Sequence, residues 1–263
     1  MQQLFITAIE STVIQLSGTA GIFFIFGYLF YYLQKGILKQ YQKSFGWNSM
    51  MITAWIGTPI HEFGHLLFAL IFNYRIKKVE LFNPNKKTGR MGHVKYGYVK
   101  HSILHRFGKF FVGAGPLILG SGIILVLMYF LVPNGAEIYQ TILKNSQASF
   151  LAQAQNVLVD LFAAENLTSY KFWIFTYLAL SLVTHISPSK RDRSQMWSGL
   201  IWFGFILLLL NLAALAFFDI NLNIYTDQLV SYMSVLTSIF IFSLLLALIH
   251  YILATLILSP FRS

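Results

Sequence analysis

The sequence predicts an all-α, polytopic membrane protein with about six transmembrane helices and a small membrane-associated β-hairpin after the second of them. Hydrophobic residues make up 56% of the chain, charged residues only 11%, and the mean hydropathy is +0.63. Ordinary soluble domains have about 25% charged residues. The apolar residues also gather into segments of about 20 residues, the length that an α-helix needs to cross a bilayer.

Six apolar segments are long enough, or nearly long enough, to span the hydrocarbon core. They are residues 12–34, 50–73, 110–132, 170–188, 196–218 and 229–258. The residues before the first span contain Glu10 and are expected to form an interfacial helix. The fourth segment is the shortest and most polar, and it ends in "LVTHISPSK".

Two of the connecting segments have patterns of their own. In "KKVELFNPNKKTGRMGHVKYGYV", residues 77–99, two partly alternating runs flank the turn residues "NPNKKTG", which predicts a β-hairpin. Residues 133–169 have helical periodicity and few charges, and are expected to form a surface helix.

The positive charges predict the orientation in the membrane. Residues 74–109 hold ten lysines and arginines: Arg75, Lys77, Lys78, Lys86, Lys87, Arg90, Lys95, Lys100, Arg106 and Lys109. Six alternating spans place this loop on the same side as residues 189–195 and Arg262. The positive-inside rule then predicts a multi-pass protein of the cell (cytoplasmic) membrane with both termini in the cytoplasm. The net charge of +10 thus follows membrane topology, and no nucleic-acid partner is expected.

One motif places ionisable groups inside the second apolar segment. In "TPIHEFGH", His61 and His65 are four residues apart, so both imidazoles lie on one helix face and can bind the same metal ion. Glu62 is offset by one residue and can accept a proton from metal-bound water, as in H-E-x-x-H metalloproteases with Zn²⁺. Ionisable residues within a span indicate a functional site by default. The alternative is a polar trio satisfied by neighbouring helices.

A catalytic zinc usually has three protein ligands, so a third must come from elsewhere in the chain. The candidates are Asp192 and His185, both in "LVTHISPSKRDRSQMWSG". Asp192 could instead pair at the surface with Arg191 or Arg193, and His185 could orient a ligand or the substrate. His250 is expected to hydrogen-bond a neighbouring helix. The chain has no cysteine, which excludes thiolate ligands and cysteine nucleophiles.

Two residues near the motif favour a polar cavity and close helix packing. Pro59 can loosen the helix just before His61, and loosened backbone at membrane depth is tolerated where it lines a cavity. Gly64 lacks a side chain between the two histidines, so another helix can approach closely there.

The chain resembles the site-2 protease family of intramembrane zinc metalloproteases. The resemblance rests on "HEFGHLLFAL" in an apolar helix, the hairpin stretch after it, "FVGAGPLILG" and a later helix with an aspartate. It implies that His61, His65 and Asp192 hold Zn²⁺ and that Glu62 is the catalytic base, with the active site towards the cytoplasmic side. Asp192 stands in "SPSKRDRSQ", whereas the family commonly has Asp-Gly at its third ligand.

The resemblance also implies three regions along the chain. Residues 1–49 are the N-terminal interfacial segment and first transmembrane helix, residues 50–200 a catalytic core, and residues 201–263 the C-terminal transmembrane helices. The expected activity is hydrolysis of a peptide bond in or near the transmembrane segment of a membrane protein substrate. The expected partners are that membrane protein or peptide and the lipid bilayer.

Two alternatives remain open at the level of sequence. The chain could be a non-proteolytic zinc-binding membrane protein, or a metal-ion transporter that uses the same histidines. The hairpin could hold an unwound substrate as an added strand, or bind anionic lipid headgroups through its basic residues.

Overall fold

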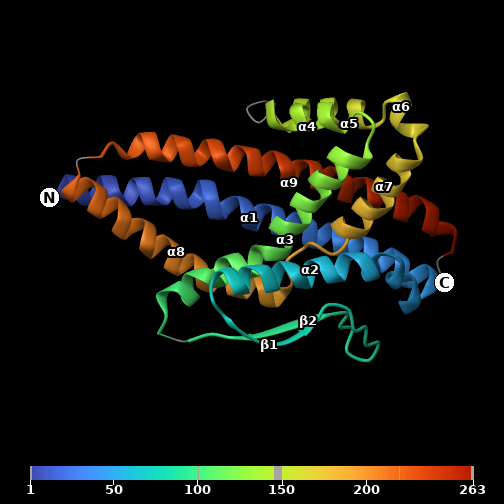
Figure 1. The fold of residues 1–263 in the computed structure, drawn as a ribbon, viewed down its shortest axis with the longest axis horizontal. Helices are drawn as coiled ribbons and strands as arrows, with labels where there is room; N and C mark the ends of the chain where they lie inside the picture. Colours follow the sequence, from blue (N-terminus) through green and yellow to red (C-terminus); the bar gives the residue numbers. More distant parts are fainter. Residues whose placement is uncertain (1, 100, 145–149, 219, 262–263) are drawn as a thin grey trace.

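The computed structural model describes residues 2–99, 101–144, 150–218 and 220–261, and 81% of it is helical (Figure 1). In chain order its elements are α1 (Gln2–Phe45), the 3₁₀ helix η1 (Trp47–Met50), α2 (Met51–Ile71), β1 (Arg75–Glu80), β2 (His93–Gly97), α3 (Ile103–Leu131), α4 (Gly135–Lys144), α5 (Phe150–Leu161), α6 (Ala164–Leu167), α7 (Tyr170–Val183), α8 (Lys190–Phe217), α9 (Leu222–Leu258) and the 3₁₀ helix η3 (Ser259–Phe261).

Four of the described helices are long and apolar enough to cross a membrane: α1, α3, α8 and α9 together with η3. This agrees with an all-α membrane protein, but the prediction of six spans is not confirmed. The segment predicted at 50–73 forms α2, in which Pro59 and the polar motif residues interrupt the apolar sequence. The segment predicted at 170–188 is helical only as α7, whose 14 residues extend about 21 Å, less than the roughly 30 Å of a hydrocarbon core.

Two element boundaries also differ from the prediction. The interfacial helix expected in the first sixteen residues is continuous with the first span, and both belong to the 44-residue α1. The expected surface helix in residues 133–169 is divided into α4, α5 and α6. Residues 145–149 of that segment, and Lys100 and Arg262 of the charge argument, lie outside the described residues.

Helices α1 and α9 lie side by side and run in the same direction (Figure 1). Near their first residues, Nε2 of Gln15 donates to Oγ1 of Thr226 at 3.0 Å. Near their last residues, the hydroxyl of Ser44 donates to the carbonyl of Leu258 at 3.0 Å. If each helix crosses the bilayer once, the two ends of the described chain face opposite sides. The cytoplasmic location of both termini stays a prediction.

Helix α8 packs antiparallel to α1. The amide of Asn211 donates to both Thr12 and Gln15 on α1, so a buried polar cluster ties α1, α8 and α9 together. Hydrogen bonds of this kind link helices where few other polar partners exist. A core rich in phenylalanine fills the centre of the molecule between α1, α3, α7, α8 and α9.

The predicted hairpin forms between α2 and α3. Strands β1 and β2 pair antiparallel, with Arg75 opposite Gly97 and Glu80 opposite His93, and with an irregularity between Ile76 and Lys78. Both strands lie along α2 (Figure 1). The residues that join them, 81–92, return over the motif-bearing part of that helix, since a Cβ atom on Gly92 would lie 2.7 Å from the side chain of Glu62 and 3.0 Å from that of Thr58.

Candidate metal centre

Helix α2 places the two motif histidines on one face, with their Nε2 atoms 3.2 Å apart. Each ring faces a backbone carbonyl at its other nitrogen. Nδ1 of His61 is 2.6 Å from the oxygen of His185, and Nδ1 of His65 is 2.8 Å from that of Val112. A carbonyl can only accept a hydrogen bond, so both Nδ1 atoms carry the proton. In the neutral rings both Nε2 atoms therefore present lone pairs to the same point.

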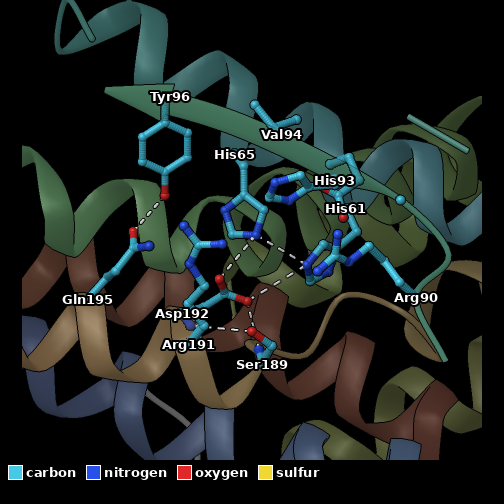
Figure 2. A pocket seen from close by; sticks show the side chains of 12 residues that line it. His61, His65, Arg90, His93, Val94, Tyr96, Ser189, Arg191, Asp192 and Gln195 are labelled. Atoms are coloured by element: carbon cyan, nitrogen blue, oxygen red, sulfur yellow. Dashed lines mark hydrogen bonds and ion pairs between the residues drawn. The ribbon is translucent and has the colours of Figure 1, made fainter. Parts of the chain in front are cut away.

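Asp192, in the first turn of α8, completes this group. Its Oδ1 lies 3.3 Å from Nε2 of His65, and its Oδ2 lies 3.8 Å from Nε2 of His61 (Figure 2). Ser189 caps the helix reciprocally: Ser189 N–H donates to Oδ2 of Asp192 at 2.8 Å, and Asp192 N–H donates to the Ser189 hydroxyl at 3.3 Å. This capping box fixes the carboxylate, which is only 5% exposed, towards the histidines.

The donor set fits a divalent metal ion. One atom from each of His61, His65 and Asp192 lies within 4.8 Å of the others. Two imidazole lone pairs and a carboxylate converge there, all of them acceptors, so a cation satisfies them better than any hydrogen bond among themselves. Two nitrogens and one oxygen at this spacing are a common ligand set for zinc, and the carbonyls behind the histidines orient the rings as outer ligands do in such sites.

Close contacts between helix backbones bring these ligands together. A Cβ atom on Gly64 of α2 would lie 2.7 Å from the backbone nitrogen of Pro116 on α3, and one on Gly115 would lie 2.6 Å from the carbonyl oxygen of Gly64. A Cβ atom on Gly113 would lie 2.6 Å from the carbonyl of Asp192. The expectation that Gly64 permits close helix approach is therefore confirmed. Helix α2 continues through Pro59 without interruption.

Glu62 lies beside the three converging groups and under the hairpin. Its carboxylate faces the backbone N–H of Val94 on β2, and its side chain packs against Gly92. A cavity of about 300 Å³ joins Glu62 to His61, His65 and Asp192. The structure thus places the base candidate and the three ligand candidates on one cavity.

Basic residues surround this cavity. Arg90 from the hairpin and Arg191 from α8 line it on either side, together with His93 (Figure 2). Burial, followed by the charges of Arg90 and Arg191, lowers the pKa of His93. The positive potential at the mouth of the cavity is therefore set mainly by the two guanidinium groups, which stay charged at all physiological pH values.

The other sequence candidates have different surroundings. Nε2 of His185 lies 3.1 Å from the hydroxyl of Thr53, so its side chain faces away from the ligand group while its carbonyl holds His61. His250 is bonded to Tyr41 and Thr184 of neighbouring helices, as expected. Asp192 makes no ion pair with Arg191 or Arg193 among the described residues.

Several residues of the site were not identified from the sequence. The motif Ser-x-x-Asp at 189–192 is a recognisable capping signal and could have indicated that Asp192 begins a helix. The Tyr96 hydroxyl donates to Oε1 of Gln195 at 2.6 Å and closes one wall of the cavity. Burial raises the pKa of Tyr96 to about 12, so this hydroxyl remains a donor at physiological pH. The carbonyls of Val112 and His185 have no sequence signal.

Comparison of the chain with protein-family models, with curated proteins and with solved structures finds no match.

Proposed function

We propose that this protein is a zinc-dependent endopeptidase of the membrane that resembles the site-2 proteases and hydrolyses a peptide bond in or near the transmembrane segment of a membrane protein. The observation that carries this proposal is the convergence of His61, His65 and Asp192 on a cavity that also contains Glu62. A purely structural metal site has no need for an additional carboxylate on the cavity wall.

His61, His65 and Asp192 would hold the ion. A bound zinc ion would polarise the scissile carbonyl and lower the pKa of a water molecule. Because Ser189 N–H engages Oδ2 of Asp192, the other carboxylate oxygen is the one best directed at the ion. The carbonyls of Val112 and His185 would keep the imidazole rings in the tautomer that offers Nε2.

Glu62 would act as general base and then as general acid. It follows His61 directly, so its carboxylate lies next to the ligand group without belonging to it. From there it can take the proton of the attacking water and deliver it to the leaving amine nitrogen. The N–H of Val94 and the packing of Gly92 restrict the position of the carboxylate.

The substitution Glu62→Gln tests this assignment. It removes the base but none of the three ligands, so the purified variant is expected to retain zinc in elemental analysis. Membranes that contain it are expected to accumulate an uncleaved membrane protein that the wild type cleaves, with turnover lower by a factor of 10² or more. Glu165→Gln, at an exposed position on α6, is the matched control and should behave as wild type.

Unchanged cleavage by the Glu62→Gln protein would overturn the role of Glu62. A chain that binds zinc but produces no new peptide termini in comparative analysis of membrane proteins would overturn the protease proposal as a whole. Zinc flux through vesicles that contain the protein would then favour a transporter.

A further inference from the structure

The cavity at the candidate metal centre has two neighbouring cavities with which it shares wall residues, and a further cavity adjoins one of these. On one side it shares Tyr96, Arg191 and Gln195 with a cavity of about 590 Å³. On the other side it shares His61 and Glu62 with one of about 350 Å³, which adjoins a fourth of about 470 Å³ at Tyr31 and Met91. We call this run of four cavities the site groove. It passes the ligand group and lies partly beneath the hairpin.

The charges along the site groove are almost all positive. Its lining includes Lys35, Lys39, Arg90, Lys109, Lys190 and Arg191. The acidic residues of that lining are Glu62 and Asp192, which belong to the metal centre. Among the described residues, none of the six cations forms a salt bridge with a carboxylate; the salt bridges in this part of the chain join Asp192 to the two histidines and Lys78 to Glu80.

The origin of these cations indicates a binding role for them. They come from α1, from the hairpin and the adjoining α3, and from α8, which are three regions far apart in the sequence. Lys86 and Lys87, at the tip of the hairpin, are exposed and do not line any of the four cavities. Arg90 and Arg191 are exposed as well, but unlike Lys86 and Lys87 they line the cavity that contains the ligand group.

Arg90 and Arg191 lie nearest to the ligand group, from the hairpin and from α8 (Figure 2). A guanidinium group can bind a carboxylate through two parallel hydrogen bonds, and such bonds are about twice as strong as neutral ones. Two unpaired arginines on the wall of a shared cavity therefore provide complementary positions for carboxylates on either side of the metal centre.

We infer that the site accepts an acidic polypeptide segment, with Asp or Glu side chains near the scissile bond held by Arg90 and Arg191. This inference rests on the proposed function and names its substrate class. Glu62 and Asp192 do not oppose it, because the metal ion neutralises the charge of the ligand group.

Peptide binding to the full-length Glu62→Gln protein tests the inference, because it does not depend on cleavage. The protein is loaded with zinc and placed in nanodiscs of uncharged phosphatidylcholine. Three fluorescent peptides share length and apolar residues and differ only in Glu, Gln or Lys at the flanking positions. Fluorescence anisotropy is expected to give a Kd at least about tenfold lower for the Glu peptide than for the Gln peptide, with the Lys peptide weakest. The preference should decrease as salt rises.

Paired substitutions assign the preference to particular residues. Arg90→Gln combined with Arg191→Gln is expected to reduce the Glu-over-Gln preference to less than about threefold, and Arg90→Glu to improve binding of the Lys peptide. Lys86→Gln combined with Lys87→Gln removes the same charge outside the site groove and is the matched control, which should keep the full preference.

Equal Kd values of the Glu and Gln peptides for the Glu62→Gln protein with no further substitution would overturn the inference. So would a result in which the arginine substitutions change only the affinity for nanodiscs containing anionic phosphatidylglycerol, since the groove would then be a lipid headgroup site. A protein that binds the Glu peptide selectively, but whose unsubstituted form never cleaves it, would refute the proposed protease and leave the charge preference standing.

Discussion

Asp192 connects the start of α8 to the candidate metal centre. Its Oδ2 accepts from the N–H of Ser189, while its Oδ1 lies 3.3 Å from His65. The same carboxylate therefore stabilises a helix terminus and is the candidate third ligand. His185, the alternative third ligand, contributes its backbone carbonyl to His61 and directs its ring to Thr53.

These contacts predict different results for two substitutions at buried residues. Asp192→Ala removes a ligand and is expected to lower zinc affinity by more than about 100-fold, measured by competition with a chelator, because even outer ligands contribute about 10–100-fold. His185→Ala keeps the backbone carbonyl that faces His61, so it should lower zinc affinity by less than about tenfold. Ser189→Ala removes only the helix cap and controls for the loss of about 1 kcal/mol at that helix end. If the Asp192→Ala protein keeps full zinc affinity, Asp192 is not the third ligand.

Part of the site at this scale follows from the sequence. Spacing alone places His61, Glu62 and His65 together, because a helix repeats every 3.6 residues. Asp192 was a candidate by its chemistry, but its contact with His65 depends on how α2, α3 and α8 pack. The carbonyls of Val112 and His185 leave no trace in the sequence, since every residue has a carbonyl.

At the scale of the elements, α3 determines how closely α2 and α8 approach each other. Its segment Gly113–Pro116 contacts the backbone of Gly64 on one side, and Gly113 contacts that of Asp192 on the other. The sequence indicated the contact at Gly64, because small residues are frequent where membrane helices pack closely. It did not indicate which helix would fill that position.

Two glycines of α3 provide a matched test of this packing. Gly115→Ala introduces a Cβ atom 2.6 Å from the carbonyl of Gly64 and is expected to cost about 1–3 kcal/mol in thermal or denaturant unfolding and to weaken zinc binding. Gly122→Ala meets no atom within 4 Å and is expected to be neutral or stabilising by up to about 1 kcal/mol. Similar effects of the two substitutions would show that the contact does not determine the geometry of the ligands.

Sequence patterns predicted the secondary structure of each segment better than whether a helix crosses the membrane. The alternation and turn residues of 77–99 identified the hairpin, because both are local properties. The number of spans depends on how the helices lie in the bilayer, which is not local. The polar motif of α2 and the early end of α7 at Val183 keep these two helices out of the four that are long and apolar enough to be candidate spans, so the prediction of six is not confirmed.

At the scale of the whole molecule, α1 and α9 are parallel, so the first residues of α1 and the last residues of α9 lie at opposite ends of the helix pair. Contacts at both ends of the pair, Gln15 with Thr226 and Ser44 with Leu258, establish the common direction. The positive-inside argument assumed six crossings and therefore placed both termini together. Charge alone does not reveal that two long helices run in the same direction.

Cysteine labelling can test this arrangement directly, because the chain contains no cysteine of its own. Gln2→Cys and Ser259→Cys place one thiol at each end of the helix pair, at exposed positions. A membrane-impermeant maleimide applied to intact cells is expected to label one of the two variants and not the other. Lys87→Cys at the exposed tip of the hairpin should be protected if the candidate site faces the cytoplasm. Equal labelling at the two ends would contradict the parallel arrangement of spanning helices.

The capping of α8 by Ser189 and Asp192 also has a consequence for biosynthesis. His61 and His65 leave the ribosome long before Asp192, so the nascent chain first presents a pair of imidazoles without the carboxylate. The ligand set is complete only when α8 has been synthesised and its first turn has formed, because that turn directs the carboxylate. If the site binds zinc as proposed, metal loading would be a late event, and a ribosome-bound chain that ends before α8 should hold zinc weakly.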